Sequence, residues 1–141
     1  TLGIGLPLQQ RRIIIKPTLF ELLREFHETY GAAIDQDFSL DLILLREKLL
    51  AEEFYEVLQE ILYFETPEFY KKKLTKELAD LMYVTIGFAT TFGLPLEEVF
   101  YEVHKSNMSK LGPNGEVLRR EDGKILKGIN YKEPDLDQFF S

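Results

Sequence analysis

Four acidic residues, arranged in two pairs, could carry chemistry in this chain. Glu53 and Glu56 stand three positions apart, as do Glu77 and Asp80. On helices, this spacing places both carboxylates of a pair on one face, so two adjacent helices would direct four carboxylates at a common centre. Four clustered negative charges repel one another. A divalent cation would offset them, and oxygen ligands suit Mg²⁺ best, with Mn²⁺ as the alternative. The pattern therefore predicts a metal site that serves phosphate chemistry.

The residues around the second pair favour a site over a solvated surface. Asp80 is followed by Leu81 to Leu96, sixteen residues without a charged side chain. A carboxylate next to such an apolar run is rarely left without a partner. The alternative is that these acids only solvate the polar faces of amphipathic helices. That alternative is favoured for a single pair, whereas two pairs on consecutive helices favour a functional site.

Several other residues are candidates for contacts with a substrate. Arg46 precedes Glu53 by seven positions and shares its helix face, so it could reach a phosphate, and Tyr83 follows Asp80 by one turn and could line a base pocket. Asn107 and Lys110 are again three positions apart. The remaining basic candidates are in the tail: Arg119, Arg120, Lys124 and Lys127. The alternative for these lysines is that they are solubilising charges, or that they complement a helix dipole.

The two histidines do not extend the acidic pattern. His27 and His104 each follow a glutamate by two positions rather than three, so the Glu-x-x-His motif of di-iron bundles is absent. Both are interpreted as structural or peripheral. No glycine-rich phosphate-binding motif occurs either. The acidic pairs therefore remain the strongest candidates for chemistry.

Composition limits the class of protein. The chain has 141 residues, 45% of them hydrophobic, which is enough for one globular domain with its own core. Its net charge of -7 argues against binding to nucleic acid polymers, which requires clustered Lys and Arg. No cysteine is present, which excludes disulfides and thiol catalysis. Neither a secretory signal nor a membrane-spanning segment is recognisable. We expect a cytoplasmic protein without a membrane partner.

The elements that must position the acids are helices. Thr18 with Glu21 forms a capping-box pattern that starts a helix ending at Gly31, and Ser39 starts a second helix over about 40–65. Pro67 starts a third helix to about residue 92, and Pro95 a fourth to about Lys110. Residues 12–16 could form a short strand, and the tail could form a hairpin over 117–125. The sequence predicts an all-α, antiparallel four-helix bundle in a single domain 1–141, with a core over 18–110 and an irregular tail over 111–141.

The order of these motifs resembles a known superfamily. Glu52-Glu53-x-x-Glu56, then Glu77-x-x-Asp80, then Asn107-x-x-Lys110 is similar to the all-α nucleoside triphosphate pyrophosphohydrolases. That superfamily includes MazG-like proteins, dimeric dUTPases and phosphoribosyl-ATP pyrophosphohydrolases, and the resemblance covers residues 18–110. The tail from Gly123 to Asn130 resembles the extension of some MazG-like members.

The resemblance implies an activity and a set of roles. A MazG-like enzyme would hydrolyse a nucleoside triphosphate between its α- and β-phosphates, giving a nucleoside monophosphate and pyrophosphate. Its Mg²⁺ ligands would be Glu53, Glu56, Glu77 and Asp80, and Glu52 would be a further ligand or the catalytic base. It would be a homodimer or homotetramer whose sites are completed by a neighbour.

Two alternative functions remain open on the sequence. One is a phosphoribosyl-ATP pyrophosphohydrolase, which performs the same chemistry on a biosynthetic intermediate and would be distinguished by testing substrates. The other is a non-catalytic helical interaction module, whose acids are a solvated face. Measuring stability with and without Mg²⁺ would distinguish this module from an enzyme, because only a protein with a preformed metal site is stabilised by Mg²⁺.

Overall fold

Helices make up the regular structure of this protein. The computed structural model describes residues 16–141. Its elements, in order, are α1 (Leu19–Tyr30), α2 (Leu40–Ile61), α3 (Pro67–Phe92), α4 (Leu96–Met108) and a short 3-10 helix, η2 (Asp137–Phe139). Within this range no strand forms, and the all-α prediction is confirmed. The short strand predicted over 12–16 lies outside the described residues except for its last position.

The helix ends follow local signals in the sequence. The hydroxyl of Thr18 accepts a hydrogen bond from the Glu21 amide at 3.1 Å, and that of Ser39 accepts one from the Leu42 amide at 3.4 Å. Gly31 and Gly93 end α1 and α3 with φ values of 70° and 62°, in the left-handed region that favours glycine. These four boundaries match the prediction. Helix α2 stops at Ile61, about one turn earlier than predicted.

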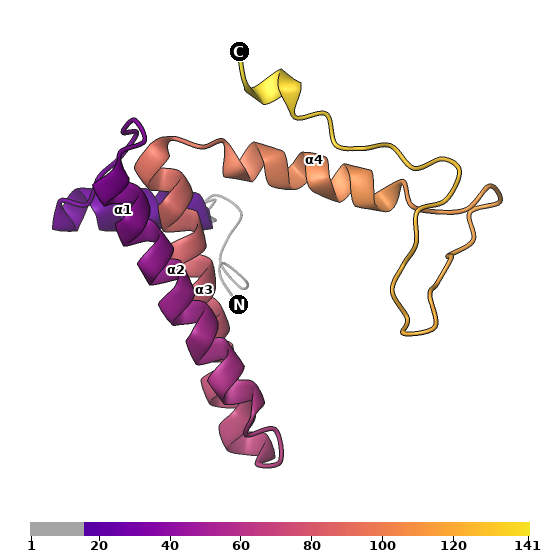
Figure 1. Ribbon diagram of the computed structural model, residues 1–141, viewed down its shortest axis with the longest axis horizontal. Helices are drawn as coiled ribbons and strands as arrows, with labels where there is room; N and C mark the ends of the chain where they lie inside the picture. The colour runs from indigo at the N-terminus through magenta and orange to yellow at the C-terminus, as the bar shows by residue number, and fades with distance from the viewer. Residues whose placement is uncertain (1–15) are drawn as a thin grey trace, which may run out of the picture.

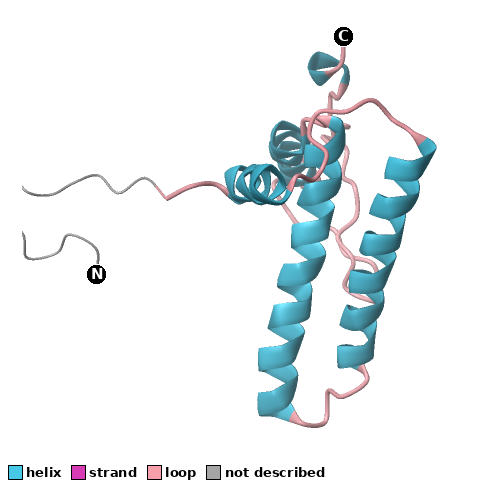
Figure 2. Cartoon of the chain, turned by 90° about the vertical axis from the view of Figure 1, so that its left-hand side faces the viewer, coloured by secondary structure: helices cyan, strands magenta, loops and turns pink. Residues whose placement is uncertain are grey.

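The two long helices form an antiparallel hairpin. Figure 1 shows α2 and α3 running side by side along most of their length, and Figure 2 shows the same pair from another side. Val57 is the buried apolar residue of α2, and it shares that helix with the buried charged residues Arg46 and Glu60. The buried apolar residues of the described chain are few: Leu23, Val57, Ile86, Ala89 and Phe92. Because Glu53 and Val57 are one turn apart on α2, the acids lie next to this hairpin core.

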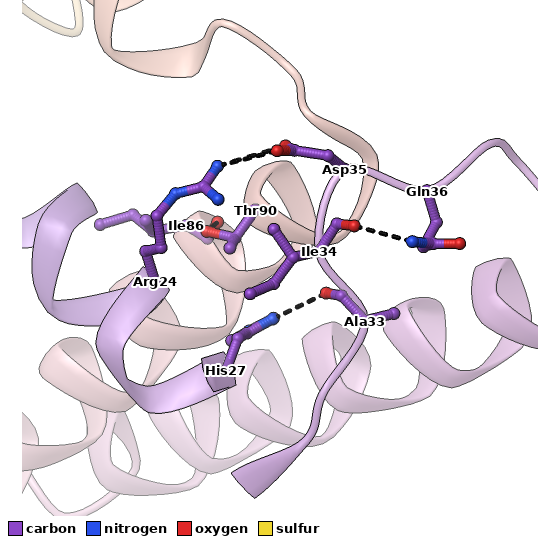
Figure 3. Close-up of polar contacts among 8 residues, drawn as sticks. All are labelled: Arg24, His27, Ala33, Ile34, Asp35, Gln36, Ile86 and Thr90. Atoms are coloured by element: carbon purple, nitrogen blue, oxygen red, sulfur yellow. Dashed lines mark hydrogen bonds and ion pairs between the residues drawn. The ribbon is translucent and has the colours of Figure 1, made fainter. Parts of the chain in front are cut away.

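Helix α1 and the segment after it are fixed to the second half of α3. The Asp35 amide donates to the Thr90 carbonyl at 3.1 Å, and the Gln36 amide donates to the Thr91 carbonyl at 2.8 Å. Figure 3 shows this junction, where the Arg24 guanidinium pairs with Asp35 at 3.2 Å and Nδ1 of His27 donates to the Ala33 carbonyl at 2.9 Å. His27 is buried in this junction, as expected for a structural histidine.

Helix α4 does not pack against the other helices to complete a bundle. The chain bends by 119° between α3 and α4, across Gly93 to Pro95, and α4 then extends away from the hairpin (Figure 1). Proline at the start of α4 and a left-handed glycine at the end of α3 allow no continuous helix here. Within residues 16–141, the predicted antiparallel four-helix bundle is therefore not confirmed: α1, α2 and α3 pack together, and α4 stands apart.

The tail returns along α4. The buried Ser106 hydroxyl donates to the Lys132 carbonyl at 2.7 Å, and the Lys132 amide donates to the Ser109 hydroxyl at 2.9 Å. Before this, the predicted hairpin forms as one antiparallel bridge between Arg119 and Ile125. No described helix is long and apolar enough by itself to cross a membrane; α3 and α4 meet that test only when joined across their bend, by length and composition alone.

Candidate metal centre

Three carboxylates from the two long helices meet on the hairpin. Glu53 comes from the middle of α2, and Glu77 and Asp80 come from α3. One oxygen of each lies within 4.8 Å of the others. Antiparallel pairing brings the second half of α2 opposite the first half of α3, which is why acids separated by more than twenty residues meet. The predicted convergence of the two pairs thus holds for these three residues.

The other two acids of the first motif lie at the edge of this group. Glu56 is exposed, one turn after Glu53, and is not part of the trio that meets within 4.8 Å. Glu52 is exposed as well, and its carboxylate lies 4.0 Å from the ammonium of Lys48. Their predicted roles, ligand for Glu56 and base for Glu52, remain predictions. Both side chains are nevertheless within a turn of Glu53 on the same helix.

The burial of Glu77 makes the acid trio unfavourable without a cation. Glu77 is only 5% exposed, and its Oε2 has no hydrogen-bond partner. Desolvation, together with the nearby Asp80 and Glu77 carboxylates, raises the pKa of Glu53. A buried carboxylate oxygen without a donor is destabilising unless a ligand satisfies it. The trio therefore has the properties of a site that receives a positive charge.

A lysine supplies part of that charge in this structure. The ammonium of Lys76 lies 2.6 Å from Oδ2 of Asp80 and 3.6 Å from Oε1 of Glu77. The hydrogen bond to Asp80, followed by the charges of Asp80 and Glu77, raises the pKa of Lys76. The sequence interpretation missed this residue, although its spacing of four from Asp80 is the usual one for a helical ion pair.

The donor set fits a divalent metal ion. All three groups offer carboxylate oxygen, the ligand type that Mg²⁺ and Mn²⁺ favour, and the unsatisfied Oε2 of Glu77 is a ready ligand atom. Asp80 is partly exposed, so an ion and a phosphate group could approach from its side.

The candidate substrate residues on α4 and the tail are not brought to the acid trio within one chain. Asn107 is exposed and Lys110 half-buried at the end of α4, which extends away from the hairpin. Lys124 is in the tail hairpin, where its amide donates to Asp122. The ammonium of Lys127 lies 4.6 Å from the centre of the Tyr131 ring, a cation–π contact. Their phosphate-binding roles stay predictions.

Arg46 and Tyr83 lie on the hairpin itself. Arg46 is 8% exposed, its Nε has no hydrogen-bond partner, and burial lowers its pKa. Its Nη1 would be 3.2 Å from a Cβ at Gly87, so the glycine makes room for the guanidinium. Tyr83 meets Phe26 edge to face with ring centres 5.3 Å apart, and Phe26 contacts Tyr30 at 4.8 Å. This partly exposed aromatic cluster of Phe26, Tyr30 and Tyr83 begins one turn after Asp80.

Glu60 is a further buried acid that the sequence interpretation missed. Glu60 is 3% exposed, its Oε1 pairs with the Lys73 ammonium at 3.2 Å, and its Oε2 has no partner. It follows Glu53 by seven positions, so it continues the same face of α2 toward the hairpin turn. That spacing could have identified Glu60 from the sequence as a residue on the same face as Glu53.

Comparison with known proteins found a matching family model. The family model described as phosphoribosyl-ATP pyrophosphohydrolase matches residues 23–107. The match includes most of α1, all of α2 and α3, the acid trio, and α4 as far as Asn107, and it leaves out the tail. No curated protein matches the chain.

Proposed function

We propose a function from one premise: this chain belongs to the phosphoribosyl-ATP pyrophosphohydrolase family, within the MazG-like superfamily of all-α nucleotide pyrophosphohydrolases. Members of such a family are hydrolases of nucleotides. The proposed reaction is metal-dependent hydrolysis of the bond between the α- and β-phosphates. Water adds at phosphorus, the bridging P–O bond breaks, and a nucleoside monophosphate and pyrophosphate are released.

One observation carries this proposal. Glu53, Glu77 and Asp80 meet within 4.8 Å on the part of the chain that the family model matches. A bound Mg²⁺, or Mn²⁺, would neutralise the phosphate charge and stabilise the charge that develops in the transition state. The trio would hold the ion, with Glu56 as a fourth ligand after a change of side-chain rotamer. This assignment also explains the unsatisfied oxygen on the buried Glu77.

Glu52 is the proposed base. It stands next to Glu53 but is exposed, so its carboxylate is free to accept a hydrogen bond and then a proton from an attacking water. The Lys48 ammonium at 4.0 Å would help to orient it. Arg46 and the lysines at positions 110, 124 and 127 would be counter-charges to the polyphosphate, supplementing the metal.

The aromatic cluster supports a nucleotide as the substrate. Tyr83 lies one turn after Asp80 and is packed against Phe26, with both rings partly exposed. Aromatic faces stack well on nucleobases. A triphosphate bound at the acids would bring its base toward this cluster. A nucleoside triphosphate is therefore the proposed substrate class, and phosphoribosyl-ATP is the second candidate, favoured by the description of the matched family.

The proposed enzyme is a homo-oligomer. Helix α4 exposes apolar side chains, with Phe100 67% and Tyr101 68% exposed, although the tail covers part of its surface. A second copy that packs on α4 would bury these rings and complete a helical bundle between chains. It would also bring Asn107 and Lys110 of one chain toward the acids of the other, in a dimer or a tetramer.

A substrate panel tests the proposal. The purified chain with Mg²⁺ should release pyrophosphate, and not orthophosphate, from at least one member of a panel of ribo- and deoxyribonucleoside triphosphates and phosphoribosyl-ATP. The highest kcat/KM identifies the substrate. Asp80→Asn should lower this activity by at least about 100-fold, since a metal ligand is lost. Release of orthophosphate alone, or no product from any nucleotide by a folded chain, would contradict the proposal and favour a non-catalytic helical module.

A further inference from the structure

The ammonium of Lys76 contacts the acid trio formed by Glu53, Glu77 and Asp80. Its ammonium is 2.6 Å from Asp80 and 3.6 Å from Glu77, and thus contacts two of the three carboxylates. Its side chain is 67% exposed. The lysine therefore reaches from the surface of α3 back onto the acids, and nothing else in the described structure fixes its position.

The ammonium and a metal ion would compete for the same oxygens. Three carboxylate oxygens that meet within 4.8 Å enclose a space for one small cation. An ammonium at hydrogen-bond distance from Asp80 already occupies one carboxylate oxygen of the trio. Two positive charges a few ångströms apart in a partly buried site also repel each other. Metal binding and the present position of Lys76 therefore oppose each other.

The character of the side chain makes such an exchange feasible. Lysine is a compact point charge on a flexible four-carbon stem, unlike the rigid fork of arginine. Because the side chain is largely exposed, the ammonium can move into solvent without opening the core. The carboxylates, in contrast, are fixed by two long helices. The acids can therefore keep their arrangement while the cation between them changes.

We propose that Lys76 is the resident counter-ion of the acid trio, which a divalent metal ion must displace, so that this lysine sets the metal affinity of the site. The inference rests on the proposed function, since it takes the trio to be the metal site. With the metal absent, Lys76 offsets the repulsion among the acids and stabilises the α2–α3 hairpin. With the metal present, the site binds it more weakly than three carboxylates alone would.

A metal titration without nucleotide tests this inference. Mn²⁺ and Mg²⁺ are titrated into the metal-free chain by calorimetry, with free Mn²⁺ counted by electron paramagnetic resonance. Lys76→Gln should bind metal about 5- to 30-fold more tightly than the wild type, because one charge-assisted hydrogen bond no longer has to be broken. Lys76→Arg keeps the charge and should stay within about 3-fold of the wild type.

Lys71→Gln is the matched control. It removes the same charge from the same helix, on the face away from the acids, and its side chain is exposed. Its metal affinity should equal that of the wild type. In melting experiments without metal, Lys76→Gln should be less stable than Lys71→Gln, and saturating Mg²⁺ should close that gap. An unchanged or weaker affinity of Lys76→Gln would overturn the inference while leaving the proposed function intact. A wild-type chain that binds no divalent metal would overturn both.

Discussion

At the scale of single residues, the acid trio balances function against stability. Oε2 of the buried Glu77 has no hydrogen-bond partner, and the pKa of the nearby Glu53 is raised. Groups arranged in this way usually belong to functional sites, because a protein gains no stability from them alone. These carboxylates should therefore destabilise the metal-free chain by a measurable amount that depends on pH.

Glu53→Gln tests that cost. The pKa of Glu53 is raised above its ordinary value of 4.5 in the folded chain. Well below 4.5 the group is protonated in both states and does not affect stability. As pH rises through the raised pKa, ionisation increasingly destabilises the fold. Without metal, Glu53→Gln should therefore melt at a higher temperature than the wild type at pH 7. That difference should shrink toward zero as the pH falls to 4.5.

Thermal melting from pH 4.5 to 8 in a chelating buffer measures this. Glu65→Gln is a suitable control, because Glu65 is exposed and lies beyond the end of α2, away from the acid trio. Its melting temperature should follow that of the wild type. A lower melting temperature for Glu53→Gln at pH 7 would show instead that this carboxylate stabilises the fold.

At the scale of elements, the junction between α3 and α4 decides where α4 points. Gly93 takes φ 62°, and a Cβ there would lie 3.0 Å from Oδ1 of Asp35. The Asp35 carboxylate is itself paired with Arg24 of α1 (Figure 3). The end of α3, the segment after α1 and α1 itself are therefore held together at one point.

Gly93→Ala should destabilise the fold more than Gly31→Ala does. Both glycines end a helix in the left-handed region, so an alanine at either costs roughly 1–2 kcal/mol. A Cβ at Gly31 meets nothing within 4 Å, whereas one at Gly93 crowds Asp35. Urea unfolding of both variants isolates that crowding. If the two variants lose equal unfolding free energy, the segment around Asp35 moves aside without a measurable penalty.

At the scale of the whole molecule, the acid trio and α4 are separate parts of one chain. Lys110 follows the end of α4, which extends away from the hairpin, so we expect a neighbouring chain to supply it to the acid trio. An oligomer whose sites combine the acids of one chain with α4 of another would resolve this separation.

Mixing two impaired variants tests this arrangement. Glu77→Gln should remove the metal site, and Lys110→Ala should lower kcat/KM by about 10- to 100-fold through loss of a charge-assisted hydrogen bond. In a mixed dimer one site carries both defects and the other carries neither. After unfolding and refolding together, an equal mixture should regain about one quarter of wild-type activity.

The matched control combines two defects on the same element. A mixture of Glu77→Gln with Asp80→Asn damages the acids of every chain, so it should regain nothing. Size-exclusion chromatography with light scattering should show a dimer or tetramer in all samples. If Glu77→Gln and Lys110→Ala mix into a dimer and activity does not recover, the sites are not shared between chains.

Local chemistry was readable from the sequence alone. Caps at Thr18 and Ser39, glycines at 31 and 93, and 3.6-residue periodicity fix the helices, because these signals act over a few residues. The spacing of the acids then determined which face of each helix carries them. Antiparallel pairing of consecutive long helices made the meeting of Glu53 with Glu77 and Asp80 predictable, and the family match agrees with it.

Only the tertiary structure decided what surrounds those acids. Lys76 contacts the trio while Glu56 stays outside it, and Arg46 is buried against Gly87, since side-chain rotamers and burial depend on neighbouring helices. The direction of α4 was equally beyond the sequence. The break at Gly93 and Pro95 marks where a helix ends, but its angle depends on the surface against which the next helix packs, whether in its own chain or in a neighbour.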